Sequence, residues 1–297
     1  MTNAGALHTV ASPQRRRRRI AVLWHARDRA RRLDRYVITR FADYWREDGH
    51  EVRFVFGPSG FVPADIALLH VDLSVVPEPY LELAARYSVC LNGRVRDIRH
   101  STFSRHIVRP GDGYEGAVIV KSDLNHGGLP ERTLEGPLRR AWRRLRRGFP
   151  SRDSDSLSCG TPLEYRVYQH CCDVPSACFQ RPDLMVERFL PEREDGLYHV
   201  RTYQFLGDRW TCTRLSSSEP VVNDHTEIRS EPVEPHPDIE RLRQALDFDY
   251  GKFDYVLHAG EPVLLDTNKT TNVSAVVTPE LEVMRRHRAM GLYSYFA

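Results

Sequence analysis

The chain has 297 residues, enough for two or three compact units on one polypeptide. Hydrophobic residues make up 41% and charged residues 28%, as in ordinary folded proteins, which excludes a chain that is disordered throughout. No apolar run approaches the roughly 20 residues that a membrane helix requires, so we expect a cytoplasmic protein with no membrane partner.

The net charge of +3 conceals two dense arginine runs. Residues 15–19 are all arginine, and we favour a solvated arm there over a polyanion contact. Six more arginines lie within residues 139–147, where Leu138, Trp142 and Leu145 recur at helical spacing. This second run predicts an amphipathic helix with a basic exterior, packed on the body of the protein.

The six cysteines show neither a CxxC pair nor a regular spacing for disulfides or zinc. Cys171 and Cys172 follow His170, but adjacent ligands rarely close a tetrahedral metal site. We therefore expect free thiols in a reducing compartment.

A basic tail, residues 1–18, is expected to be disordered and to precede an alternation of strands and helices. Apolar runs predict four strands, at 19–25, 51–56, 64–72 and 87–92. Helical spacing predicts helices between them, at 33–45 and 77–87. This pattern is typical of a small parallel α/β domain, which we place at residues 19–95.

The pattern of predicted elements changes near residue 183, beyond which strands follow one another closely. Residues 96–183 contain one strong strand at 116–121 and the Arg-rich segment, and they predict a central subdomain. Residues 184–297 predict a C-terminal subdomain of the α+β kind, with strands at 184–190, 198–206, 209–216, 252–258 and 262–268 and helices at 237–246 and 279–290. The fold class expected for the whole chain is α/β.

Polar side chains gather where strands end in three segments, at 118–128, 184–194 and 249–270. In the first, Lys121 ends an apolar strand and the loop after it carries Asn125, Gly127 and Gly128. Glycines let backbone N–H groups approach phosphate oxygens, and a lysine supplies a compact positive charge. The first segment therefore predicts a phosphate contact.

The third segment predicts a magnesium site. Asp266 and Asn268 lie two apart on one strand and so share a face, and Asp254 lies on the preceding strand across a hairpin. Two carboxylates and an amide oxygen suit Mg²⁺, which commonly takes its remaining ligands from water and nucleotide phosphates. A polar hairpin on the surface is the alternative interpretation.

The carboxylates share a face only if the register of the hairpin has the right parity. We predict that Leu257 pairs with Glu261 around a three-residue loop, 258–260, with Gly260 at positive φ. A two-residue turn would instead send the two carboxylates to opposite faces.

The placement of lysines supports both sites. Of the 43 Lys and Arg residues only three are lysines, and these lie in the first and third segments: Lys121, Lys252 and Lys269. Since arginine serves almost everywhere else, lysines retained here indicate a need for a point charge at phosphate.

In this order and spacing, the three segments resemble the ATP-grasp superfamily, of which D-alanine–D-alanine ligase and glutathione synthetase are familiar members. The resemblance covers residues 115–275 and implies an N-terminal α/β domain followed by two subdomains that clasp ATP. In that family a lysine at the end of a central strand contacts the phosphates, and it corresponds to Lys121. The flexible loop that closes over the phosphates corresponds to residues 122–128, with the contacts Asn125, His126, Gly127 and Gly128.

The hinge strand of that family, which holds adenine through backbone groups, resembles the second segment. The resemblance implies that Glu192 or Glu194 takes the ribose and that adenine is bordered by Glu187, Arg188, Phe189 and Leu190.

The late acidic hairpin of the family implies magnesium bound by Asp254, Asp266 and Asn268. It also implies that Lys252 faces the transferred phosphate. Arg201, on the strand after the hinge, would be a further clamp for a phosphate or carboxylate.

The resemblance implies a ligase that uses Mg-ATP to activate a carboxylate as an acyl phosphate and joins it to an amine. The acceptor would be a small molecule or a peptide. A kinase of the same fold, acting on a small anionic acceptor, is the alternative. A nucleic-acid-binding protein anchored by the arginine runs is a third hypothesis, disfavoured because the runs carry no recognised module.

Overall fold

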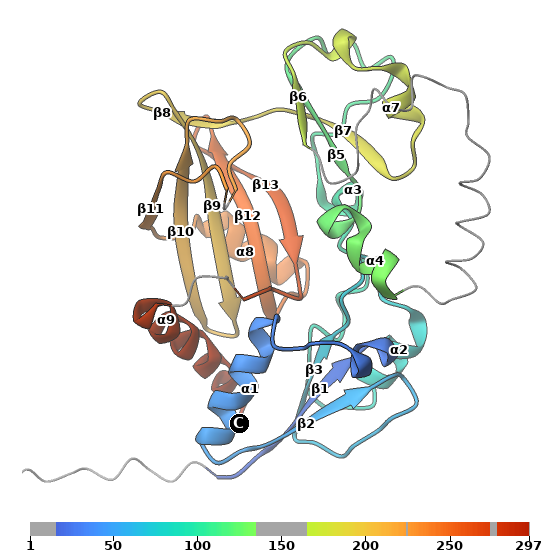
Figure 1. Cartoon of the computed structure of the whole chain (residues 1–297), viewed down its shortest axis with the longest axis vertical. Coiled ribbons are helices and arrows are strands. Elements are labelled where there is room, and N and C mark those ends of the chain that lie inside the picture. Colours follow the sequence, from blue (N-terminus) through green and yellow to red (C-terminus); the bar gives the residue numbers. More distant parts are fainter. Residues whose placement is uncertain (1–15, 135–164, 224, 274–277, 297) are drawn as a thin grey trace, which may run out of the picture.

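Three β-sheets form the framework of the computed structural model, which describes residues 16–134, 165–223, 225–273 and 278–296. The N-terminal sheet lies at the bottom of Figure 1, the small central sheet above it, and the large C-terminal sheet beside both. The fold class predicted from the sequence, α/β with an antiparallel C-terminal half, is confirmed. The predicted Arg-rich helix at 139–147 lies outside the described residues.

The N-terminal sheet is parallel, as its apolar runs predict. Its strands follow the order β2-β1-β3-β4, with bounds Glu51–Phe56, Arg19–Trp24, Ile66–His70 and Cys90–Leu91. Strand β1 is buried from Ile20 to Trp24 because it lies inside the sheet, which is covered on both faces. The connecting helices are η1 (Ala26–Ala30), α1 (Val37–Glu47) and α2 (Glu78–Ala84).

Arg18, the last residue of the predicted basic tail, is hydrogen-bonded to the N-terminal domain. The N–H of Arg18 donates to His50 Nδ1 (3.2 Å), and the Arg18 carbonyl accepts from the N–H of Glu51 (2.9 Å). The tail predicted to end at residue 18 is therefore wrong at that residue, while residues 1–15 lie outside the described chain.

The central sheet is antiparallel and has its own small core. Its order is β6-β5-β7, with bounds Arg166–Tyr168, Val118–Ser122 and Leu184–Arg188. Its helices are short: α3 (His100–Phe103), η2 (Asn125–Gly128), α4 (Leu129–Leu134), η3 (Cys171–Asp173) and α7 (Ser176–Gln180). Because β7 pairs with β5, the chain leaves the central sheet after Arg188 rather than at residue 184.

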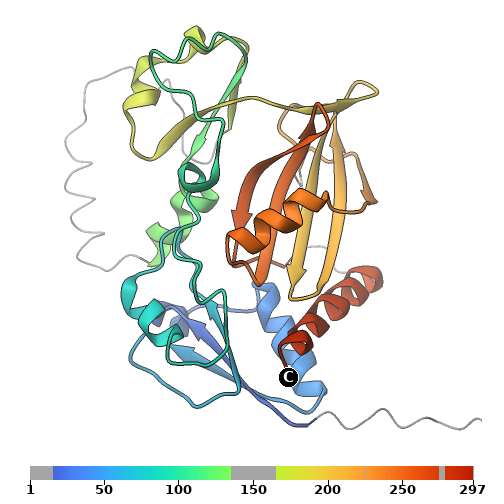
Figure 2. The ribbon, with the colours of Figure 1, turned by 180° about the vertical axis from the view of Figure 1, so that it is seen from behind.

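The large sheet has the order β11-β10-β9-β12-β13, with β8 added beside β9. The bounds of these strands, from β8 to β13, are Glu192–Glu194, Leu197–Leu206, Arg209–Ser217, Arg229–Pro232, Tyr250–His258 and Glu261–Asn268. Helix α8 (Pro237–Ala245) packs on one face through Ile239, as Figure 2 shows. Helix α9 (Pro279–Ala289) and η4 (Met290–Tyr295) end the chain beside α1.

The N-terminal sheet and the large sheet share one hydrophobic core. Leu206 and Tyr250 of the large sheet and Leu292 of η4 join the cluster around Trp24. The indole N–H of Trp45 in α1 also donates to a carbonyl of α9 (2.8 Å). These two parts of the chain are therefore packed as one body.

Asn92 ties the end of the N-terminal sheet to the start of β12. It is fully buried, with φ at 56°. Its side-chain oxygen accepts from the N–H groups of Asp249 (2.9 Å) and Tyr250 (3.1 Å), and its amide donates to the Tyr250 carbonyl (2.7 Å). One side chain thus satisfies backbone groups that burial would otherwise leave unpaired.

The expectation of free cysteines is only partly met. Cys90, Cys171, Cys172 and Cys212 are free thiols, whereas Cys178 is disulfide-bonded, which corrects the expectation for that residue. Among the described residues, no helix is long and apolar enough to cross a membrane.

We predict that Gly251→Ala destabilises the fold. A Cβ at this position would lie 2.5 Å from the carbonyl oxygen of Asn268, so strands β12 and β13 must separate. Overpacking of this kind costs about 1–3 kcal/mol, which thermal unfolding would detect. Gly196→Ala is the control for backbone strain alone, since its φ is 80° but its Cβ meets nothing within 4 Å, and we expect the larger loss at Gly251. Equal melting temperatures for the Gly251→Ala variant and the wild type would contradict the packing argument.

Candidate active site

The β12–β13 hairpin turns more tightly than the sequence suggested. His258 pairs with Glu261 around a two-residue turn, so the predicted three-residue loop is wrong. Ala259 and Gly260 both have positive φ, 52° and 86°, as a type I′ turn requires. The prediction for Gly260 is therefore confirmed, although in a different turn.

A β-bulge at Leu265 restores the parity that the tight turn would have lost. Tyr255 pairs with Leu264, but Asp254 pairs with Asp266, so Leu265 is the extra residue of the ladder. Directly opposite residues of an antiparallel pair point to the same face. Asp254 and Asp266 therefore share a face, as predicted, for a reason that was not predicted.

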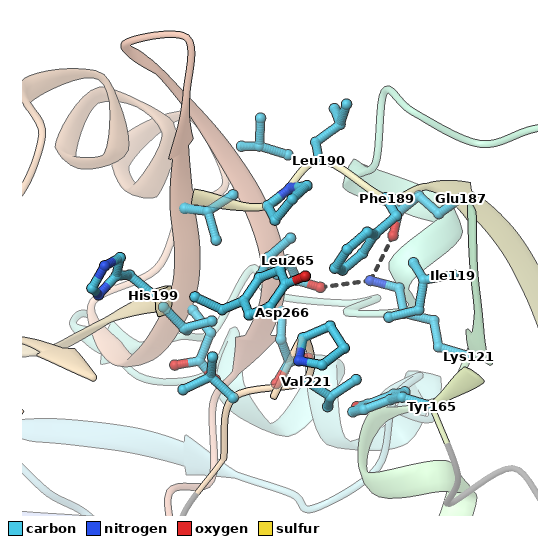
Figure 3. Close-up of a pocket in the computed structure, with 18 of the residues that line it drawn as sticks. Ile119, Lys121, Tyr165, Glu187, Phe189, Leu190, His199, Val221, Leu265 and Asp266 are labelled. Atoms are coloured by element: carbon cyan, nitrogen blue, oxygen red, sulfur yellow. Dashed lines mark hydrogen bonds and ion pairs between the residues drawn. The ribbon is translucent and has the colours of Figure 1, made fainter. Parts of the chain in front are cut away.

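Lys121 reaches from the central sheet to this bulge. Its Nζ donates to the Leu265 carbonyl oxygen (2.9 Å) and lies 2.7 Å from Glu187 Oε2 on β7 (Figure 3). Lys121 and Glu187 are only 5% and 4% exposed, so each buried charge needs the other. Glu187 also accepts from the hydroxyl of Ser104.

The two aspartates have different surroundings. Asp254 accepts from the Thr202 hydroxyl (2.9 Å) and forms an ion pair with Lys252 (2.6 Å). Asp266 Oδ1 lies 3.1 Å from Nε2 of buried His100 in α3. Burial acts to raise the pKa of Asp266, but His100 and the charge of Lys252 outweigh it and lower the pKa to about 2. Asp266 is therefore an anion at neutral pH.

Asn268 is already hydrogen-bonded within its own chain segment. Its Oδ1 accepts from the N–H of Thr270 (2.7 Å), which leaves the amide Nδ2 beside His126 Nε2 (3.1 Å). The loop residue His126 thus contacts the acidic hairpin. The oxygen predicted as a magnesium ligand would have to be shared with Thr270.

A cavity lies between the central and large sheets, and we call it the first cavity (Figure 3). It is lined by seven of the residues predicted from the sequence: Lys121, Glu187, Arg188, Phe189, Leu190, Asp254 and Asp266. Its remaining wall is mostly apolar, with Ile119, Val222, Val256 and Val263. A flat apolar group and a nearby anionic group could both be accommodated by such a lining.

Other predicted residues lie away from the first cavity. Glu192 is buried, pairs with Arg201 (2.9 Å) and Arg214 (3.4 Å), and accepts from the Leu257 N–H (2.8 Å). Glu194 is exposed and pairs with Arg214. Glu192, predicted to hold ribose, is thus bound to Arg201, predicted to clamp an anion, and the predicted roles of Glu192, Glu194 and Arg201 remain predictions.

The loop 122–128 takes the left-handed shape that its glycines allow. His126, Gly127 and Gly128 have φ of 47°, 61° and 70°. The N–H of Asn125 donates to the Ser74 hydroxyl (3.0 Å), and the N–H of Gly127 to a carbonyl of the same loop. These two N–H groups are therefore engaged within the protein.

Several lining residues were missed from the sequence, among them Tyr165, Tyr198, Val221, Val256 and Val263. Val256 lies two residues from Asp254 on β12, so strand parity could have found it, whereas Val263 shares that face only because of the bulge at Leu265. Tyr165 and Val221 come from segments without periodicity, and no sequence signal marks them. Buried His100 was missed because α3 is too short to show a pattern.

No family model matches the chain, and no curated protein matches it. Solved structures do. A RimK domain protein ATP-grasp from Sphaerobacter thermophilus is 16% identical with a TM-score of 0.46, over 93% of this chain and 98% of that one. The ATP-grasp ligase PsnB, solved with a minimal precursor, is 12% identical with a TM-score of 0.45, over 89% and 93%.

D-alanine–D-alanine ligase from Bacillus anthracis is 8% identical with a TM-score of 0.41, over 95% of this chain and 100% of that one. These names agree with the resemblance found in the sequence. Identities and TM-scores this low carry no inference about activity, substrate or residues. The function must therefore be inferred from the chain's own residues.

We predict that Lys121→Met destabilises the protein by about 3–5 kcal/mol, because it leaves the Glu187 carboxylate buried without its partner. The double variant Lys121→Met/Glu187→Met should recover part of this loss, since no charge is then stranded. Chemical denaturation of the wild type, of the single variants Lys121→Met and Glu187→Met, and of the double variant measures the coupling. Strictly additive losses would show that the two side chains do not act as a pair.

Proposed function

We propose that the chain is an ATP-grasp enzyme that binds Mg-ATP in the first cavity and uses it to join a carboxylate to an amine. One observation carries the proposal: a lysine from the central sheet and two carboxylates from the large sheet line one cavity with an apolar wall. A nucleotide needs these three environments together, for its base, its phosphates and its metal ion.

The apolar wall suits the adenine ring. Ile119, Phe189, Val256 and Val263 come from both sheets and would pack on the two faces of a planar base. The N–H of Phe189 is already used, because it donates to the Ala117 carbonyl (2.9 Å). The backbone groups of its neighbours in the connection after β7 would therefore hold the edge of the adenine ring. Lys121 would then lie toward the phosphates as a compact charge.

The donor set fits magnesium. Asp254 and Asp266 supply oxygen ligands from directly opposed positions, and Mg²⁺ commonly uses one or two carboxylates together with phosphates and water. Among the described residues, no three His, Cys, Asp or Glu side chains form a closed metal cage, so a site completed by phosphate oxygens is the better match. When bound, the metal would neutralise charge on the phosphoryl group being transferred.

The reaction itself needs positioning more than covalent help from the protein. A carboxylate oxygen of the acceptor attacks the γ-phosphorus, and the bond to the β-phosphate oxygen breaks to release ADP. The amine nitrogen then attacks the acyl carbon, the carbon–oxygen bond to phosphate breaks, and phosphate and a proton leave. Lys252, which forms an ion pair with Asp254, would add its charge beside these phosphate oxygens. Ligation is preferred to phosphorylation as the commoner chemistry of ATP-grasp proteins.

Mg-ATP should raise the melting temperature. A ligand that binds only the folded state stabilises it by about 2.7 kcal/mol at a hundredfold excess over its dissociation constant. EDTA should remove most of the gain, because the carboxylates then face the phosphates without a cation. A melting curve that millimolar Mg-ATP leaves unchanged would contradict the proposed function.

Asp254→Asn and Asp266→Asn should each lower ATP turnover by at least about a hundredfold, because an amide is a poorer magnesium ligand than a carboxylate. Circular dichroism should show intact folds. Asp208→Asn is the matched control, since Asp208 is exposed in the β9–β10 turn and should leave turnover unchanged. Wild-type rates in either site variant at saturating magnesium would remove the metal assignment.

A further inference from the structure

A second cavity, of about 290 Å³, lies between the N-terminal sheet, the loop 122–128 and the segment after β13. Ligand sites for small molecules begin at about 300 Å³, so the space suits a small group. Tyr165 lines both this cavity and the first one, and His126 and Gly127 contribute from the loop. A molecule in the second cavity would therefore lie next to the proposed phosphate site.

Arg35 supplies the positive charge of this cavity. Its side chain is 43% exposed, and its guanidinium lies over the Tyr36 ring at 4.5 Å. It donates to the Tyr36 hydroxyl and lies 3.7 Å from Asp72 Oδ2. A guanidinium carries five N–H donors, so these contacts leave donor capacity on the exposed side.

Asp72 also lines the cavity, but its carboxylate is already used. Oδ2 accepts from the Tyr36 hydroxyl (2.7 Å), and Oδ1 accepts from the Thr270 hydroxyl (2.8 Å). Asp72 is only 5% exposed. Its role is therefore to orient Arg35 and Tyr36 rather than to bind an incoming cation.

His126 presents a further donor. Because Asn268 Oδ1 is fixed by the N–H of Thr270, the Asn268 amide donates to His126 Nε2. The ring proton of the neutral imidazole then belongs on Nδ1. His126, which lines this cavity, thus has a ring N–H to donate, and Arg35 adds a positive charge.

We propose that the second cavity binds a carboxylate of the acceptor, with Arg35 as its anchor. The inference rests on the proposed function and names the chemistry of its acceptor. A carboxylate would match the planar donor pair of the guanidinium, whereas an amine would meet the positive charge of Arg35 and a carboxylate, Asp72, that is only 5% exposed and already paired. The acceptor is accordingly recognised as an anion from the N-terminal domain while its reacting oxygen faces the nucleotide.

The test measures binding to the full chain with magnesium and a non-hydrolysable ATP analogue. The probes are propionate, glutarate and N-acetylglycine, each beside its amide, in isothermal titration. At least one carboxylate should bind with an affinity about tenfold higher than that of its amide. This is the difference in affinity expected for one charge-assisted contact that is partly exposed to solvent. A panel in which no carboxylate is preferred overturns the inference. Failure of the ATP analogue to bind instead counts against the proposed function.

Arg35→Gln should weaken the preferred carboxylate by about tenfold and leave the affinity for the ATP analogue unchanged. Arg35→Lys should lose part of the affinity, because it keeps the charge but not the planar fork, and it serves if the first variant does not fold. Arg32→Gln is the control: Arg32 is 88% exposed, pairs with Asp34 and precedes Arg35 in the same loop. Carboxylate binding that is equal in all variants overturns the assignment to Arg35.

Discussion

The extra residue at Leu265 determines what the cleft between the two sheets contains. Without it, the two-residue turn would place Asp254 and Asp266 on opposite faces of the hairpin. The bulge also frees a carbonyl from the ladder, and Lys121 takes that carbonyl from the other side of the cleft. One irregularity in β13 thus sets both the acidic face and its link to the central sheet.

The cations of the site are matched to carboxylates inside the protein. Lys121 pairs with Glu187, Lys252 with Asp254, and Arg35 lies beside Asp72. Arg201, which the sequence marked as a clamp, pairs with Glu192. An anionic ligand must therefore displace one of these carboxylates or bind beside an intact pair. The Arg35 guanidinium is the most exposed of these cations, so a ligand binding there has the least need to displace a carboxylate.

The sequence predicted the sheets better than it predicted the contacts between them. Strands such as Glu51–Phe56 follow from local periodicity, which depends on a few neighbouring residues. The bulge could not be predicted, because Leu265 is apolar like its neighbour Leu264 and either could fill a regular ladder position. A sequence shows which residues are charged but not which cross-strand partner each charge pairs with. Glu192 and Arg201 were therefore predicted as ligand contacts, although they form an ion pair with each other. His100 belongs to a helix of one turn, too short for any period.

The hydrophobic core that the N-terminal and large sheets share holds these two sheets together. Separating those two sheets would expose Trp24, Leu206 and Tyr250 to water and break the hydrogen bonds around Asn92. The central sheet has a core of its own and meets the large sheet through polar contacts, such as Lys121 with Leu265 and His126 with Asn268, together with Phe103 of α3, which packs on the core of the large sheet. Polar contacts can be exchanged for water at little net cost, whereas an apolar core cannot. Displacing the central sheet would therefore expose less apolar surface than separating the N-terminal sheet from the large sheet.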